Sequence, residues 1–164
     1  MLSSNNDVKN KEGRTMLDDL ASGFLYFSFA FFIAVLTSYM ILSSTQGPYI
    51  GYRVPHYLIV FVLTAFLTTL VFVVASVIKY ARKIIYALIC SLISVTVSFY
   101  LYEHYIIISR HLSALPLPLI IILSNGSHST YVIDIGQLSL IIAVILLYVT
   151  RNPDKNASPK NISK

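Results

Sequence analysis

The first long apolar stretch of the chain decides the fold class: residues 20–42 read LASGFLYFSFAFFIAVLTSYMIL. These 23 residues carry no charge, and a helix needs about 20 apolar residues to cross the hydrocarbon core of a bilayer. The stretch is longer than the apolar core of a signal peptide, about 7–15 residues, and no small-x-small cleavage motif closes it. It therefore predicts a transmembrane helix that is retained.

Three further apolar stretches follow, at residues 57–78, 84–102 and 131–150. The composition agrees with them, because 56% of the residues are hydrophobic and only 12% are charged, against roughly 25% charged in globular domains. A soluble domain of 164 residues has too small a core to bury so many apolar side chains. We therefore expect an all-α, polytopic integral membrane protein with four transmembrane helices in an up-down bundle.

The segment 112–123 is apolar but has only twelve residues, and Pro116 and Pro118 each lack a helical donor. It is too short to span, so we expect a short interfacial or re-entrant segment before the last helix. Residues 1–19 and 151–164 are polar, which predicts disordered cytoplasmic tails on either side of a transmembrane domain over 20–150.

The basic residues predict the orientation, because cytoplasmic loops of membrane proteins carry an excess of Lys and Arg. With the amino terminus inside, only Arg53 and Arg110 face out, and ten basic residues face in. We therefore expect a multi-pass protein of the cell membrane with both termini cytoplasmic. Asn125 begins a sequon on the outer side, and whether it is glycosylated stays open.

Each predicted span carries a face of small residues, which let membrane helices approach closely. The faces are Ala30, Ala34 and Ser38; Ala65, Thr68, Thr69 and Ser76; Ala87, Ser91, Ser94 and Ser98; and Gly136, Ser139 and Ala143.

All four histidines fall on the predicted outer side. Imidazole and carboxylate groups suit zinc, copper or iron, so the outer-face candidates for a metal or haem site are His104, His111, His128, Glu103 and Asp134. Two other interpretations stay open: solvated loop residues, and a pH-responsive surface charge. For Asp134 we favour a carboxylate that meets the dipole at the start of the last helix.

No motif predicts catalytic residues or a cofactor, and the basic residues form no stripe interleaved with aromatics, which argues against nucleic acid. We expect a non-catalytic accessory or structural subunit of a larger membrane complex, contacting the lipid bilayer and either other membrane subunits or a second copy. One alternative is a small transporter or channel component with a pore lined by Thr64, Thr68, Ser91, Ser94 and Ser98. A further alternative is a membrane enzyme or a metal- or haem-binding protein with its site on the outer face.

Overall fold

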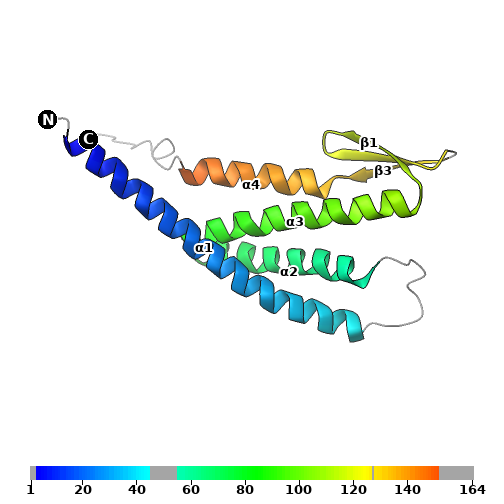
Figure 1. Ribbon diagram of the computed structural model, residues 1–164, viewed down its shortest axis with the longest axis horizontal. Coiled ribbons are helices and arrows are strands. Elements are labelled where there is room, and N and C mark those ends of the chain that lie inside the picture. Colours follow the sequence, from blue (N-terminus) through cyan, green and yellow to red (C-terminus); the bar gives the residue numbers. More distant parts are fainter. Residues whose placement is uncertain (1–2, 45–54, 127, 152–164) are drawn as a thin grey trace, which may run out of the picture.

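The computed structural model describes residues 3–44, 55–126 and 128–151 (Figure 1). Its elements are α1 (Ser3–Ser44), α2 (His56–Ile78), α3 (Arg82–Ser109), β1 (Ser113–Leu117), β2 (Ile120–Ser124), β3 (Ser129–Ile133) and α4 (Ile135–Arg151).

Three helical segments, Met16–Ser43, His56–Ile78 and Arg82–Ser109, are long and apolar enough to cross a membrane. They contain the predicted spans 20–42, 57–78 and 84–102, and they support the assignment to the transmembrane proteins. The fourth helix, α4, is also apolar but has only 17 residues.

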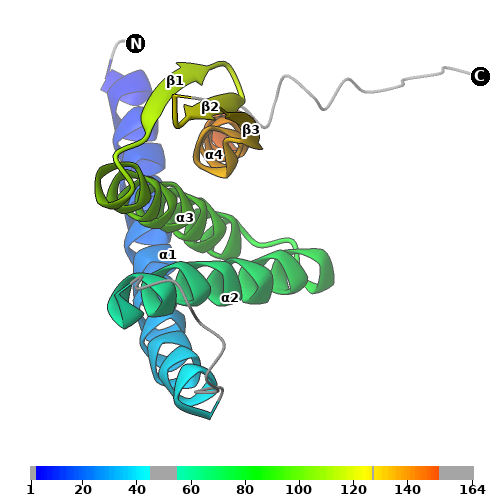
Figure 2. The same ribbon diagram turned by 90° about the vertical axis from the view of Figure 1, so that its right-hand side faces the viewer.

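The helices alternate in direction (Figure 1). The beginning of α1, the link between α2 and α3 and the end of α4 lie at one end of the molecule; the three strands lie at the other, here called the sheet end. Helix α3 packs against α1, α2 and α4, whereas α4 has no comparable interface with α1 or α2. Figure 2 shows the result, an open arrangement around α3 in place of a closed four-helix bundle.

The small-residue faces pack between the helices, as predicted. The fully or largely buried members are Ala34, Ser38, Ala65, Thr68, Ala87, Ser91, Ser98, Gly136, Ser139 and Ala143. Larger apolar side chains of α2 and α3, among them Phe72, Ile85 and Leu92, form the core beside them.

Helix α1 lies close to α3 at Gly23, a residue that the sequence did not single out. A Cβ atom at this position would lie 2.7 Å from Tyr86 Cβ and 2.8 Å from the carbonyl oxygen of Lys83. Only glycine therefore allows the two backbones to cross at this distance.

The structure is mostly helical, which is consistent with the all-α expectation, but it also contains a three-stranded sheet that the sequence did not predict. Its order is β1-β2-β3, and both strand pairs are antiparallel. The segment predicted to be interfacial or re-entrant forms β1 and β2, because its prolines disfavour a helix and three consecutive isoleucines favour a strand. The last helix begins at Ile135 and not at residue 131, since β3 occupies 129–133.

The amino-terminal segment also differs from the expectation. Residues 1–19 were predicted to be disordered, but α1 begins at Ser3 and runs through them without a break. The predicted carboxyl-terminal tail, 151–164, lies outside the described residues except for Arg151, which ends α4.

Candidate functional site

The four histidines of the chain all lie at the sheet end. His56 begins α2, His104 lies in the last turns of α3, His111 follows that helix, and His128 lies between β2 and β3. The sequence predicted one common side of the membrane for the four histidines, and in the structure they share one end of the molecule.

A cavity of about 610 Å³ lies between the last turns of α3, the sheet and the start of α4. We call it the sheet-end cavity. Its walls are mostly apolar and include Pro116 and Ile121 from the strands. Its polar lining residues are Tyr100, Glu103, His104, Asp134 and Gln137.

Asp134 is the most buried charged residue at this cavity, with only 1% of its surface exposed. Its Oδ1 accepts a hydrogen bond from the backbone N–H of Gln137 at 2.8 Å, and its Oδ2 accepts one from the Tyr100 hydroxyl at 3.4 Å. A carboxylate that accepts the N–H three residues onward is a helix N-cap. The predicted helix-start role of Asp134 is therefore confirmed.

The absence of a side chain at Gly136 leaves space for the Asp134 carboxylate and the Tyr100 ring. A Cβ atom there would lie 3.1 Å from both Asp134 Oδ1 and the Tyr100 ring. The Gly136 carbonyl oxygen also lies 3.1 Å from Thr96 Oγ1, which donates a hydrogen bond from α3 to α4. The first turn of α4 is thus held against α3 by close packing and by hydrogen bonds.

Gln137 ties α4 to the sheet, a role that the sequence did not predict. Its Oε1 accepts a hydrogen bond from the Leu119 N–H at 3.0 Å, and its Nε2 donates one to the Leu117 carbonyl at 3.3 Å. The Leu119 carbonyl accepts a third bond, from the Asp134 N–H at 3.0 Å. Leu119 has φ 63°, a left-handed conformation that a leucine keeps only where its surroundings hold it.

The five candidate metal ligands are not brought into one cluster. Glu103, His104 and Asp134 line the sheet-end cavity, while His111 and His128 are exposed at the adjacent turns. Among the residues that the structure describes, no three His, Cys, Asp or Glu side chains are grouped so that they could hold a metal ion.

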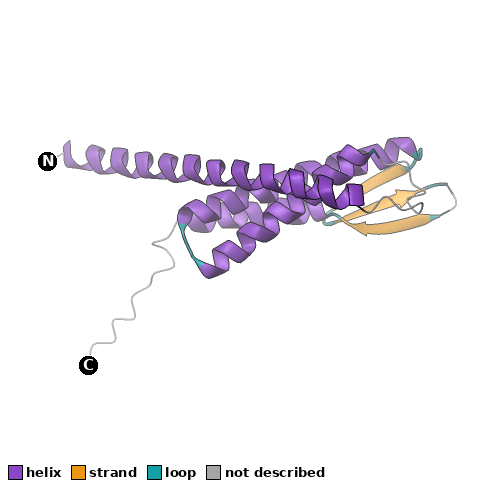
Figure 3. Cartoon of the chain, turned by 90° about the horizontal axis from the view of Figure 1, so that it is seen from below, coloured by secondary structure: helices purple, strands orange, loops and turns teal. Residues whose placement is uncertain are grey.

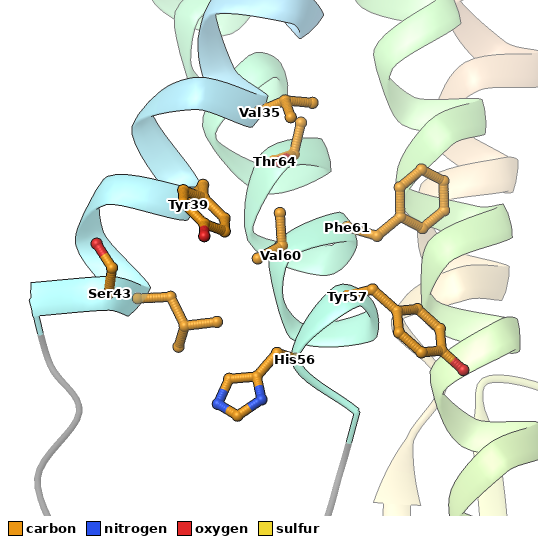
Figure 4. Close-up of a pocket in the computed structure, with 9 residues that line it drawn as sticks. Val35, Tyr39, Ser43, His56, Tyr57, Val60, Phe61 and Thr64 are labelled. Carbon is orange, nitrogen blue, oxygen red and sulfur yellow. The ribbon is translucent and has the colours of Figure 1, made fainter.

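A second hollow, of about 450 Å³, lies between the end of α1 and the start of α2. Figure 4 shows Tyr39 of α1 and His56 and Val60 of α2 around it. At its inner side, the Thr64 hydroxyl donates a hydrogen bond to Ser38 Oγ at 3.1 Å, and both residues are fully buried. This bond joins α1 to α2.

Four of the five residues proposed to line a pore are packed between helices in this chain, and the fifth, Ser94, is half-buried. Thr64, Thr68, Ser91 and Ser98 have no exposed surface. Besides the bond from Thr64 to α1, the hydroxyls of Thr68, Ser91 and Ser98 donate to carbonyls of their own helices. Within the described part of the chain, every buried polar side-chain atom has a partner. The pore alternative gains no support from these positions.

Fold and site together define a transmembrane protein whose histidines, with Glu103 and Asp134, lie at the sheet end, around a helix cap and a small sheet. Comparisons with protein families, with curated proteins and with solved structures found no match to this chain.

Proposed function

We propose that this chain is a non-catalytic accessory or structural subunit of a larger membrane complex, and that α1 supplies the contact with a partner subunit. The main support is that the other helices bury only a small part of α1. In an apolar 18-residue stretch of each of the three longest helices, 11% of the residues are buried in α1, 28% in α2 and 56% in α3.

The uncovered face of α1 has large side chains at regular intervals. We call the central set the α1 stripe; it consists of Leu25, Phe29, Phe32 and Leu36, all of them exposed. Their spacing of four, three and four residues keeps them on one face of a helix that coils around a neighbour. Aromatic and leucine side chains at these positions suit the holes of a facing helix.

The other face of α1 is already occupied. Gly23, Ala34 and Ser38 are buried on it, and the ring of Phe31 packs edge-on against Phe61 of α2, with centroids 6.1 Å apart. A partner helix would therefore lie against the α1 stripe without displacing α2 or α3. Figure 3 also shows the start of α1 projecting beyond the other helices, which adds backbone length for a contact.

The same proposal includes four spans, a place in the cell membrane and cytoplasmic termini. The up-down order brings the start of α1, the basic link with Lys79, Arg82 and Lys83, and Arg151 to the end opposite the sheet. A cytoplasmic location of that end agrees with the positive-inside rule. A single cysteine at Tyr80 should react with an impermeant maleimide only after the cells are opened, and one at Ser113 should react in intact cells, both in a Cys90→Ser background.

Site-directed photocrosslinking tests the partner contact. A photoreactive phenylalanine analogue at Phe32, in the cells that make this protein, should yield one crosslinked product with a discrete second polypeptide. The matched control is the same analogue at Val144, an equally apolar and exposed position on α4, which should give no discrete product.

Native mass measurement after extraction in a mild detergent provides the second readout. A complex heavier than the 18.4 kDa chain, lost in the double variant Phe29→Ala/Phe32→Ala, supports the proposal. A monodisperse monomer with no crosslink along the α1 stripe contradicts it.

A further inference from the structure

The register of the sheet orders its side chains by polarity. On one face, paired residues form three rows that cross all three strands. The near row, next to α4, is Leu117, Ile120 and Ile133; the middle row is Leu115, Ile122 and Tyr131; the far row is Ser113, Ser124 and Ser129. The face thus changes along the strands from aliphatic, through a row with a tyrosine, to serine alone.

This ordered face points away from the protein. Tyr131 and Ile133 are 72% and 66% exposed, and Leu115, Leu117 and Ile120 are exposed as well. The opposite face carries Ile121, which is buried, and lines the sheet-end cavity against α3. One face of the sheet therefore lines the cavity against the protein, and most side chains of the ordered face are exposed.

The rows lie just beyond the start of α4, and α4 alone is shorter than the hydrocarbon core of a bilayer. The 17 residues of α4 extend about 26 Å at 1.5 Å per residue, short of the roughly 30 Å hydrocarbon core. Figure 1 shows β3 continuing beyond the start of α4. Ile133, two residues before α4, adds about 7 Å at 3.3 Å per residue, and Tyr131 about 7 Å more. If α4 spans the bilayer, the near row would complete the crossing, and the middle row would reach the interface, where tyrosine is favoured.

In the turn between β1 and β2, at the end of the sheet nearest α4, the backbone groups of Leu119 are paired. Unpaired backbone groups cost several kcal/mol in hydrocarbon. In the turn between β1 and β2, Pro118 has no N–H, and both the N–H and the carbonyl of Leu119 are bonded to the start of α4. On the edge strand β1, Pro116 removes a further donor.

We propose that the ordered face of the sheet is a lipid-binding surface, inserted into one leaflet so that the near row contacts acyl chains, the middle row lies at the interface and the far row meets headgroups and water. The bilayer is the occupant because only a solvent with a polarity gradient matches a face graded in this way. The inference is independent of the contact proposed for α1.

Depth measurements on spin labels test this surface. Single cysteines replace one residue of each row on β1, as Leu117→Cys, Leu115→Cys and Ser113→Cys, in a Cys90→Ser background. Each variant is labelled with a nitroxide and reconstituted alone into phosphatidylcholine vesicles. Collision rates with oxygen, which concentrates in lipid, and with a water-soluble nickel complex then give the depth.

The labels should lie progressively shallower from Leu117→Cys to Ser113→Cys, over at most about 13 Å, the length of four strand residues. A label at Val144→Cys on α4 provides the deep reference, and one at Ala114→Cys, on the other face of β1, should collide less with oxygen than Leu115→Cys. Equal and high nickel access at all three rows would place the face in water and overturn the proposal. Low access to both reagents with immobilised labels would show a protein neighbour, and would overturn it equally.

Discussion

Helices α1 and α3 are alike in length and hydropathy, but they differ greatly in how much of each the rest of the protein buries. Both have membrane-spanning segments of 28 residues, with mean hydropathies of 2.0 and 2.2, yet 11% of the apolar stretch is buried in α1 and 56% in α3. Hydropathy therefore predicts which segments enter a membrane, and it does not predict which of them forms the core. The position of the small side chains decides that.

Helix α3 has neighbours on three sides, because small residues recur along it wherever another helix crosses. Ala87 lies beneath Gly23 of α1, and Thr96 bonds to the first turn of α4. In helix α1 the buried small residues, Gly23, Ala34 and Ser38, lie on one face only. In lipid, where no hydrophobic force drives helices together, close approach of this kind is the main source of association.

The largest predicted difference comes from one substitution made on each helix. Leu92→Ala on α3 removes a core side chain that is 7% exposed and should lower the free energy of unfolding by about 2–5 kcal/mol, the usual cost of a leucine cavity. Leu36→Ala on α1, where the side chain is 53% exposed, should change it by less than about 0.5 kcal/mol. Reversible unfolding of the purified chain by sodium dodecyl sulfate in mixed micelles measures both. Equal losses would contradict the comparison.

The crossing of α1 over α3 should be sensitive to one methyl group. Gly23→Ala places a Cβ atom within 2.8 Å of two α3 atoms, and overpacking of this kind costs about 1–3 kcal/mol. The same unfolding titration checks it. Ser28→Ala, on the exposed side of α1, where the hydroxyl bonds only to its own helix, is the control and should be close to neutral. A stable Gly23→Ala protein would show that the crossing is looser than described.

The cap of α4 should matter next. Asp134→Ala removes the acceptor of the Gln137 N–H and should cost about 0.5–2 kcal/mol. It should also speed hydrogen exchange at the Gln137 amide. Asp134→Asn keeps an oxygen acceptor and should recover most of the loss, whereas equal losses in both variants would point to the charge and not to the cap.

The smallest effect concerns the hydrogen bond between α1 and α2. Thr64→Val removes the donor to Ser38 and should cost about 0.6 kcal/mol, the average for such bonds between membrane helices. A double-mutant cycle with Ser38→Ala isolates the pair. A coupling energy of zero would mean that this hydrogen bond does not help to hold α1 against α2.

Much of the helical fold could be predicted from the sequence. Long uncharged stretches and their small-residue faces depend on local composition, so 20–42, 57–78 and 84–102 all fall within observed helices. The sheet could not be predicted. Its strands are short apolar runs, which do not distinguish a strand from an interfacial segment, and its Pro118–Leu119 turn lacks the Asn-Gly or Asp-Gly pair that signals a hairpin. The helix over residues 3–19 was missed because those residues have the polar composition of a disordered tail.

The candidate site was predictable only in part, for a similar reason. The N-cap role of Asp134 follows from local spacing to Gln137 and is confirmed. The contacts of Gln137 with Leu117 and Leu119 join residues that are 20 and 18 positions apart, respectively. No pattern in either segment predicts a contact with the other. That Glu103 and His104 share a cavity with Asp134 depends in the same way on how α3 and α4 pack.

The bonds between the sheet and α4 also set an order of assembly during synthesis. Residues 113–124 leave the ribosome before Asp134 and Gln137, the two residues that fasten their turn. Until residues 129–137 emerge, β1 and β2 have neither the third strand nor the partners that hold Leu119 in its left-handed conformation. We therefore expect a nascent chain arrested before residue 134 to leave this segment open to protease, and one arrested well beyond 151 to protect it.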